Sequence, residues 1–160
     1  MRIGHGYDSH RFEDGRRLIL GGVEFPGERG LAGHSDADVL VHAIIDALLG
    51  AAALGDIGSH FPDSSPEWKD ADSISLLSAV SKEISAAGYS IGNIDATVVC
   101  ERPKLRPKVE EMRNRISAAA GIGASALSIK GKTNEKMDDV GAGVGIEAYA
   151  VCLLEEKKGV

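Results

Sequence analysis

The stretch HSDADVLVHAIIDALLG, residues 34–50, decides the fold, because it predicts a strongly apolar helix. Ser35 is expected to begin the helix, with Asp38 three residues later in the position of a capping box. Gly50 is expected to end it, because glycine is common just after the last helical turn. A helix with so few polar positions is expected to bury most of its surface.

Weaker patterns on both sides of this helix predict the rest of the fold. Alternating apolar runs predict strands, regularly spaced apolar residues predict two more helices, and Gly21-Gly22 predicts a hairpin turn. The expected strands are 1–8, 17–25 (a hairpin), 93–100, 126–132 and 144–154, and the further helices are 73–88 and 107–120. This order predicts one α+β domain over residues 1–160, with a mixed sheet of about four or five strands and three helices on one face.

The predicted sheet has a face that no helix remains to cover. The strands near 94–100 and 146–154 carry apolar residues on both alternating faces. Helices can bury one of these faces, and a second copy of the chain would cover the other. The sequence therefore predicts self-association.

Composition narrows the classes of partner. The chain has 160 residues, of which 43% are hydrophobic and 26% charged, and its net charge is -6. Nucleic acid and anionic membranes are therefore not expected as partners. Cys100 and Cys152 lie in apolar runs, as expected for core thiols in a reducing compartment. No apolar signal segment follows Met1, so we expect a cytoplasmic protein, or a plastid one if a transit peptide has been removed.

The N-terminal segment GHGYDSHRF, residues 4–12, offers metal ligands. Asp8 and His10 are two residues apart, so in an extended strand both side chains project from the same face. The alternative is a turn aspartate and a surface histidine. His42 favours the metal, because an unpartnered imidazole in an apolar helix is costly.

The residues around His42 complete this interpretation. Asp46 follows His42 by four residues and is expected to accept a hydrogen bond from its second ring nitrogen. A core histidine bonded to Asp46, with no metal, is the alternative. Two imidazoles and one carboxylate form the ligand set of a catalytic zinc, which keeps a fourth position for water or substrate.

Two loops near the apolar helix carry further candidates. His34 and Ser35 lie at its expected start, where free N–H groups attract anions, although Ser35 also suits a simple cap. The loop 55–68 carries four further candidates, namely Asp56, Gly58, His60 and Asp63. Its carboxylates either hold substrate hydroxyls, or all four are solvated turn residues.

A stiff basic segment and an acidic loop complete the set. The segment ERPKLRPK, residues 101–108, gathers four cations around two prolines and suits a phosphate or a base, although such clusters are usually solvated. Lys132, Thr133 and Glu135 follow a predicted strand, where loops tend to carry sites. Glu135 suits magnesium, which prefers oxygen ligands and substrate phosphates.

Together these motifs resemble the 2-C-methyl-D-erythritol 2,4-cyclodiphosphate synthase family of the non-mevalonate isoprenoid pathway. The matching pieces are in family order and span nearly the whole chain: RIGHGYDSHRF, GLAGHSDADVLVHAIIDALLGAAALGDIGSHFPD, ERPKL and KTNEK. The resemblance implies conversion of 4-diphosphocytidyl-2-C-methyl-D-erythritol 2-phosphate to the cyclic diphosphate, with release of CMP. It also implies a homotrimer with active sites between subunits.

The resemblance also implies roles for individual residues. Asp8, His10 and His42 would hold zinc, and Glu135 would hold magnesium or manganese. His34 and Thr133 would stabilise the transition state. The implied substrate-binding residues are Asp8, His10, His34, Ser35, Lys132, Thr133 and Glu135, then Asp56, Ile57, Gly58, Phe61, Pro62 and Asp63 around the erythritol, and Cys100, Glu101, Arg102, Pro103, Lys104, Leu105 and Arg106 around the cytidine.

This chain departs from the family pattern at a few positions. Asp138-Asp139 replaces a Gly-Phe pair of many members, and Lys132 replaces a common threonine while keeping a group that suits phosphate. Ala142 stands where some members carry an arginine near the threefold axis, at which an isoprenoid diphosphate can sit. The missing arginine argues against that ligand here.

The implied reaction needs no nucleophilic side chain, because the 2-phosphate of the substrate attacks its own β-phosphorus. Positioning such an intramolecular attack can lower the barrier by roughly 7–11 kcal/mol. Two alternatives use the same residues. One is a zinc phosphohydrolase with Asp46, Asp56 or Asp63 as base, and the other is a non-catalytic trimer that the metal stabilises.

Overall fold

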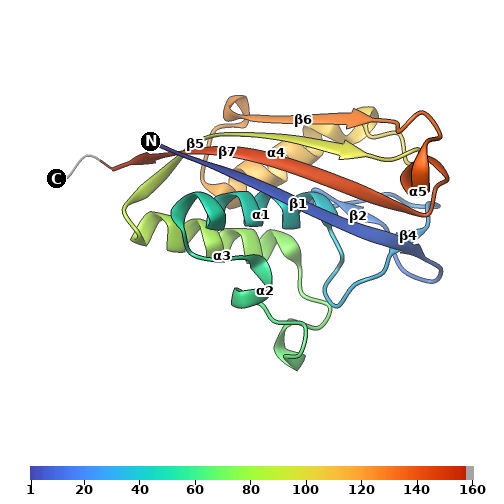
Figure 1. Cartoon of the computed structure of the whole chain (residues 1–160), viewed down its shortest axis with the longest axis horizontal. Helices are drawn as coiled ribbons and strands as arrows, with labels where there is room; N and C mark the ends of the chain where they lie inside the picture. Colours follow the sequence, from blue (N-terminus) through green and yellow to red (C-terminus); the bar gives the residue numbers. More distant parts are fainter. Residues whose placement is uncertain (158–160) are drawn as a thin grey trace.

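Five strands form one mixed sheet, and three long helices cover one of its faces (Figure 1). The computed structural model describes residues 1–157. Its strands are β1 (Arg2–Glu13), β2 (Ile19–Leu20), β3 (Val23–Glu24), β4 (Gly30–Leu31), β5 (Tyr89–Val99), β6 (Leu127–Lys132) and β7 (Gly145–Glu156). Its α-helices are α1 (Val39–Ala52), α2 (Ile57–His60), α3 (Ser73–Ala86), α4 (Val109–Ala120) and α5 (Asp138–Gly141), with single 3-10 turns at Pro66–Trp68, Arg106–Lys108 and Ala124–Ala126.

The sheet has the strand order β4-β1-β7-β5-β6. Strands β5 and β6 are parallel, and the other neighbours are antiparallel. The short strands β2 and β3 form a separate hairpin around Gly21-Gly22, as expected from the sequence. The predicted α+β class, the mixed sheet and the layer of helices are confirmed.

The boundaries of α1 differ from the prediction. The helix begins at Val39 rather than Ser35, because the Asp38 carboxylate is the cap that accepts from the backbone N–H of Val41, at 3.2 Å. Ser35 instead lies in the loop before the helix, where its hydroxyl accepts from the N–H of Ala37. The helix also continues past Gly50, to a left-handed residue at Ala53.

Two glycines bring β1 unusually close to α1. A Cβ atom on Gly6 would lie 1.9 Å from the carbonyl oxygen of Ala43, and one on Gly4 would lie 1.9 Å from that of Ala47. Both glycines point to the helix-covered side of the sheet, where successive even-numbered positions of β1 face α1. Because no side chain fits there, strand and helix meet backbone to backbone.

Asp38 ties the hairpin β2–β3 to the start of α1. Its two carboxylate oxygens accept from the N–H groups of Gly21, at 2.9 Å, and Gly22, at 2.6 Å. Burial and the neighbouring Asp36 raise the pKa of Asp38 to about 6, although its three N–H partners oppose this shift. One buried carboxylate thus fixes both a turn and a helix terminus.

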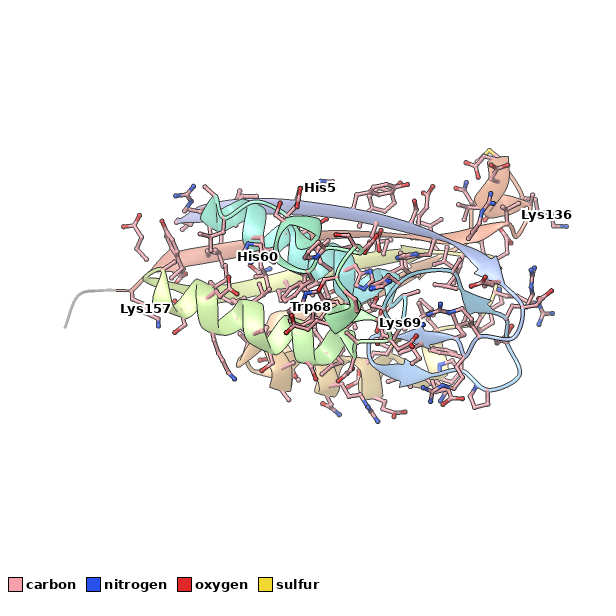
Figure 2. The ribbon with its side chains drawn as sticks, turned by 90° about the horizontal axis from the view of Figure 1, so that it is seen from below. His5, His60, Trp68, Lys69, Lys136 and Lys157 are labelled. Carbon is pink, nitrogen blue, oxygen red and sulfur yellow. The ribbon has the colours of Figure 1, made fainter. Side chains whose placement is uncertain are left out.

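The face of the sheet opposite the helices is open in a single chain. Figure 2 shows the strands on one side and the helix layer on the other. Large apolar side chains lie exposed on this open face, namely Ile3, Tyr7, Tyr149 and Val151. The rings of Tyr7 and Tyr149 pack against each other, with centroids 5.0 Å apart. The sequence-based expectation of an uncovered apolar face is therefore met within the described chain.

The helices within residues 1–157 are all too short, or too polar, to cross a membrane; the longest, α1 and α3, have 14 residues each.

Candidate active site

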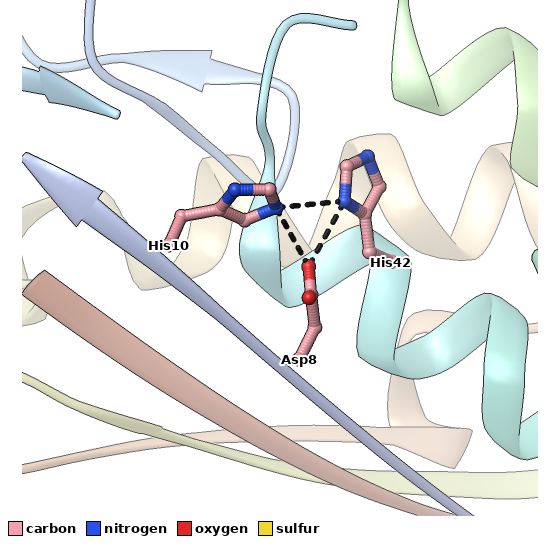
Figure 3. A group of neighbouring side chains, drawn as sticks. All are labelled: Asp8, His10 and His42. Carbon is pink, nitrogen blue, oxygen red and sulfur yellow. Dashed lines mark hydrogen bonds and ion pairs between the residues drawn. The ribbon is translucent and has the colours of Figure 1, made fainter. Parts of the chain in front are cut away.

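Asp8, His10 and His42 converge on one point between β1 and α1 (Figure 3). Asp8 Oδ2 lies 2.9 Å from His10 Nε2 and 3.0 Å from His42 Nδ1, and the two ring nitrogens are 3.3 Å apart. The two strand residues follow Gly4 and Gly6 on the same face of β1, while the histidine of α1 projects down from the helix. The close approach of strand and helix therefore sets the spacing of the cluster.

The outer nitrogens of both imidazoles are already used. His10 Nδ1 lies 2.6 Å from the carbonyl oxygen of Ala32, which can only accept, so this nitrogen donates. His42 Nε2 lies 2.9 Å from the hydroxyl of Ser73 and 3.2 Å from that of Ser35. A neutral imidazole that donates from its outer nitrogen presents a lone pair from the inner one.

When a cation replaces the protons between the two rings and Asp8, three ligand atoms face one another at a spacing that fits a divalent ion. Ligand atoms about 2.0–2.1 Å from a tetrahedral zinc are about 3.3 Å apart, close to the spacing observed here. Burial acts to raise the pKa of Asp8, but its hydrogen bonds with His10 and His42 outweigh burial and hold that pKa well below the usual range. The carboxylate is therefore ionised and ready to ligate. The predicted three-residue set is confirmed as a candidate metal site.

The expected partnership between Asp46 and His42 is wrong. Asp46 Oδ1 accepts from the backbone N–H of Ile57, at 2.8 Å, while the ring nitrogens of His42 are bonded to Asp8 and the two serines. The i, i+4 spacing puts both side chains on one side of α1 but does not fix where each points. Asp46 instead anchors α2 and the loop that follows.

The loop residues His34 and Ser35 lie beside this cluster. Because α1 begins later than predicted, both precede the helix rather than cap it. The Ser35 hydroxyl reaches His42, and His34 Nε2 lies 3.0 Å from the carbonyl oxygen of Ser65. His34 therefore bridges the loop before α1 to the loop after α2.

The segment that follows α1 is folded by its own side chains. Asp56 caps α2 by accepting from the N–H of Ser59 at 2.8 Å and from its hydroxyl at 2.6 Å. The rings of Phe61 and Trp68 meet edge to face, with centroids 5.0 Å apart. Figure 2 shows His60, Trp68 and Lys69 on the same side of the molecule, close to α2. The turn-forming alternative for Asp56 is thus observed in the unliganded chain.

A cavity of about 530 Å³ lies toward the opposite edge of the sheet, between α4 and the ends of β5 and β6. It brings together the basic segment and the end of the strand 127–132, two motifs that are separate in sequence. The lining residues are Cys100, Pro103, Lys104, Leu105, Arg106, Val109, Glu110, Ile129, Gly131, Lys132 and Thr133. An apolar floor with cationic edges suits a base attached to phosphates.

Glu101 and Arg102 do not line this cavity in the described chain, although the resemblance places them around the cytidine. The Glu101 carboxylate accepts from the backbone N–H groups of Asn134, at 3.0 Å, and Lys136, at 3.3 Å. It thereby holds the loop that carries Thr133 and Glu135. Sequence reasoning missed this contact because the partners are more than thirty residues apart.

Glu135 belongs to this second loop rather than to the Asp8 cluster. Its carboxylate accepts from the hydroxyl of Thr133, at 3.0 Å, and its backbone is left-handed, with φ at 50°. Lys136 and Asp138 are also left-handed. Residues other than glycine in this left-handed region tend to cluster at functional sites.

The metal cluster and the cavity lie at the same level of the sheet but on different strands. Asp8 on β1 pairs with Ala148 on β7, which pairs with Val98 on β5, which pairs with Gly131 on β6. Three strand spacings correspond to about 14 Å. The intervening Ala148 and Val98 are completely buried. Within one chain, the metal cluster and the cavity are therefore separate.

Comparison with known proteins agrees with this geometry. The model of the YgbB family matches residues 1–155. A 2-C-methyl-D-erythritol 2,4-cyclodiphosphate synthase from Chlorobium phaeobacteroides is 57% identical over 158 residues, which cover 99% of each chain. The protein of the same name from Salinibacter ruber is 57% identical over 155 residues, covering 97% of this chain and 99% of its own.

Solved structures give the same result. IspF of Plasmodium falciparum in complex with CDP superimposes with a TM-score of 0.85 at 35% identity, covering 98% of this chain and 97% of its own. A 2C-methyl-D-erythritol-2,4-cyclodiphosphate synthase in a CDP-bound form superimposes with a TM-score of 0.88 at 36% identity, covering 96% of this chain and all of its own.

Proposed function

The chain belongs to the YgbB family, whose curated relatives are 2-C-methyl-D-erythritol 2,4-cyclodiphosphate synthases, and we propose that it makes this cyclic diphosphate from 4-diphosphocytidyl-2-C-methyl-D-erythritol 2-phosphate. An oxygen of the 2-phosphate attacks the β-phosphorus. The bond from that phosphorus to the bridging oxygen breaks, and CMP leaves with the oxygen and the bonding electrons. The observation that carries the proposal is the Asp8–His10–His42 cluster, a cation site in a chain related to these synthases over its full length.

The metal cluster and the cavity are two half-sites of one active site. A second copy of the chain joins them. The metal cluster of one protomer and the cavity of its neighbour together have the parts that one nucleotide substrate needs. The exposed apolar face of the sheet, with Tyr7, Tyr149 and Val151, supplies a surface for this contact. A cyclic homotrimer, in which every interface is the same, gives three such sites.

Metal ions have a defined place in this proposal. Asp8, His10 and His42 would hold zinc, and Glu135 would hold magnesium or manganese; when bound, these ions would neutralise negative charge on the diphosphate. Side chains of the protein act on the transition state. His34 and Thr133 stabilise the charge that develops at the phosphorus.

The remaining predicted residues bind the substrate. Cys100 to Arg106 form the cytidine pocket, supported by the apolar cavity that much of this segment lines. Lys132 faces the same cavity and meets a phosphate. Asp56 and Asp63 face the erythritol hydroxyls, for which Asp56 would exchange its bonds to Ser59. The two buried free thiols support a cytoplasmic location.

A product assay tests the proposal. The purified protein, with zinc and magnesium, is incubated with the diphosphocytidyl substrate, and the products are followed by ³¹P NMR. We expect equal amounts of CMP and a cyclic product with two coupled phosphorus signals. CMP with a linear product would show a hydrolase and refute the cyclase.

A second arm tests the alternative that the metal only holds a trimer together. His42→Ala is expected to stay folded and trimeric by sedimentation while losing activity. Dissociation of the trimer in His42→Ala, or on chelation of the wild type, would instead favour the structural function.

A further inference from the structure

Behind His42, a short chain of hydrogen bonds leads away from the metal cluster. His42 Nε2 lies 2.9 Å from the hydroxyl of Ser73, and that hydroxyl donates a short hydrogen bond to Asp36 Oδ1. The backbone N–H of Ser73 donates to the other oxygen of the same carboxylate, at 3.0 Å. Ser73 is completely buried at the first turn of α3.

The direction of each bond in this chain is fixed by chemistry. A carboxylate only accepts, so the single proton of the Ser73 hydroxyl is used on Asp36. The serine oxygen can then only accept from His42, and Nε2 must donate. On its other side, Nδ1 lies 3.0 Å from the Asp8 carboxylate, which also only accepts. Once a cation on Asp8 replaces the proton between them, the lone pair of the neutral ring is on Nδ1 and is directed at that cation.

Ser35 cannot impose the same order. Its hydroxyl lies farther from Nε2, at 3.2 Å, and accepts from the N–H of Ala37. The described structure gives its own proton no fixed acceptor, so it can either donate to Nε2 or accept from it. Only the partner whose proton is already committed selects one tautomer.

We propose that Ser73 and Asp36 are positioning residues that hold the His42 imidazole with its proton on Nε2 and its Nδ1 lone pair directed at the cation. The inference rests on the proposed function, in that it assigns a cation to the Asp8 cluster. Asp36 also accepts from the N–H of Asp38, at 3.2 Å, so the pair joins the start of α3 to the loop before α1. The packing of α3 on α1 thereby fixes the orientation of a ligand.

Zinc affinity gives the first test. In competition with a chromophoric chelator, Ser73→Ala is expected to bind zinc about 10- to 100-fold more weakly, as is usual when the outer partner of a ligand is lost. Asp36→Ala, which frees the serine proton, should weaken zinc similarly. Ser81→Ala is the matched control, because Ser81 lies on the same helix and donates only to the carbonyl of Leu77.

The tautomer gives a second test that needs no metal. Nitrogen-15 NMR of metal-free Asp8→Asn, whose amide can donate to Nδ1 where the carboxylate can only accept, should show the proton of the neutral His42 ring on Nε2. A proton on Nδ1 would overturn the inference, as would unchanged zinc affinity in a folded Ser73→Ala. An equal loss in Ser81→Ala would do the same, because it would point to general destabilisation.

The two tests also separate this inference from the proposed function. If the wild type bound no zinc, the cation site would be wrong, and the tautomer would still decide whether Ser73 orders the ring. Recovery of zinc affinity in Ser73→Thr, which restores the hydroxyl, supports the positioning role over simple packing.

Discussion

Single residues of β1 determine whether the ligand cluster can form. Gly6→Ala puts a methyl group into the carbonyl of Ala43, so strand and helix must separate. We expect a loss of roughly 1–3 kcal/mol in the free energy of unfolding, as for overpacked cores. Zinc affinity should fall as well, because Asp8 and His42 move apart. Urea titration and chelator competition measure the two effects.

Gly50→Ala in α1 is the control, and it is expected to change stability in the opposite direction. Gly50 is exposed near the end of α1, and the nearest atom to an added Cβ is 4.0 Å away. The variant should be stabilised by about 0.5–1 kcal/mol, because alanine loses less backbone freedom than glycine. Equal destabilisation of both variants would contradict the backbone contact at Gly6.

The two cysteines should not react with thiol reagents in the native protein. Burial raises the pKa of both the Cys100 and the Cys152 thiol to about 11, so little thiolate exists at pH 8. Since thiolate is the reactive form, a disulfide reagent at pH 8 should titrate both only after denaturation. Rapid reaction of the folded protein would show that one of them is accessible, and binding of a cytidine nucleotide would then be expected to protect Cys100.

At the scale of elements, the start of α1 depends on one buried carboxylate. Asp38→Ala removes a helix cap and leaves the N–H groups of Gly21 and Gly22 without partners. We expect a loss of roughly 2–5 kcal/mol. Asp72→Ala removes the corresponding cap of α3, which is exposed, and should cost about 1 kcal/mol. Thermal or urea unfolding compares the two, and equal costs would argue against the link to the hairpin.

The loop after β6 depends on Glu101 in a similar way. Glu101→Gln keeps the shape but weakens the bonds to the N–H groups of Asn134 and Lys136, so Thr133 and Glu135 are held less firmly. We expect a lower kcat by about tenfold or more, since positioning errors are costly in catalysis. Glu111→Gln is the control, because its carboxylate pairs with Arg115 on the same helix, at 3.7 Å, and does not line the cavity; it should leave kcat unchanged.

The sequence predicted those elements whose signal is local. Residue spacing alone predicted the hairpin at Gly21-Gly22 and the helix 73–88. It also predicted the two parts of the ligand cluster, which are the Asp8–His10 pair and His42. The cap of α1 was misplaced, because Ser35, Asp36 and Asp38 all suit a helix start and only tertiary contacts choose among them. The contact of Ser73 with His42 was not predicted, nor was the contact of Glu101 with the loop after β6, because in each pair the residues are more than thirty positions apart. The purpose of Gly4 and Gly6 was also invisible before α1 was placed against them.

For the whole molecule, the separation of the two half-sites predicts complementation between chains. His42→Ala damages the cluster and Thr133→Ala damages the loop, so each homotrimer should be inactive. Trimers reassembled from an equal mixture should regain about a quarter of the wild-type activity, because by random mixing that share of interfaces is intact. Activity assays before and after co-refolding measure this. A mixture that stays inactive would show that one chain supplies both halves.

The direct contact of β1 with α1 has a consequence for how the enzyme can be handled. The spacing of the three ligands is set by polypeptide backbones that touch, and not by the ion between them. An ion bound in this way is expected to be exchangeable. The chain should then lose such an ion, take up a spectroscopically visible substitute such as cobalt, and return to its starting state without unfolding.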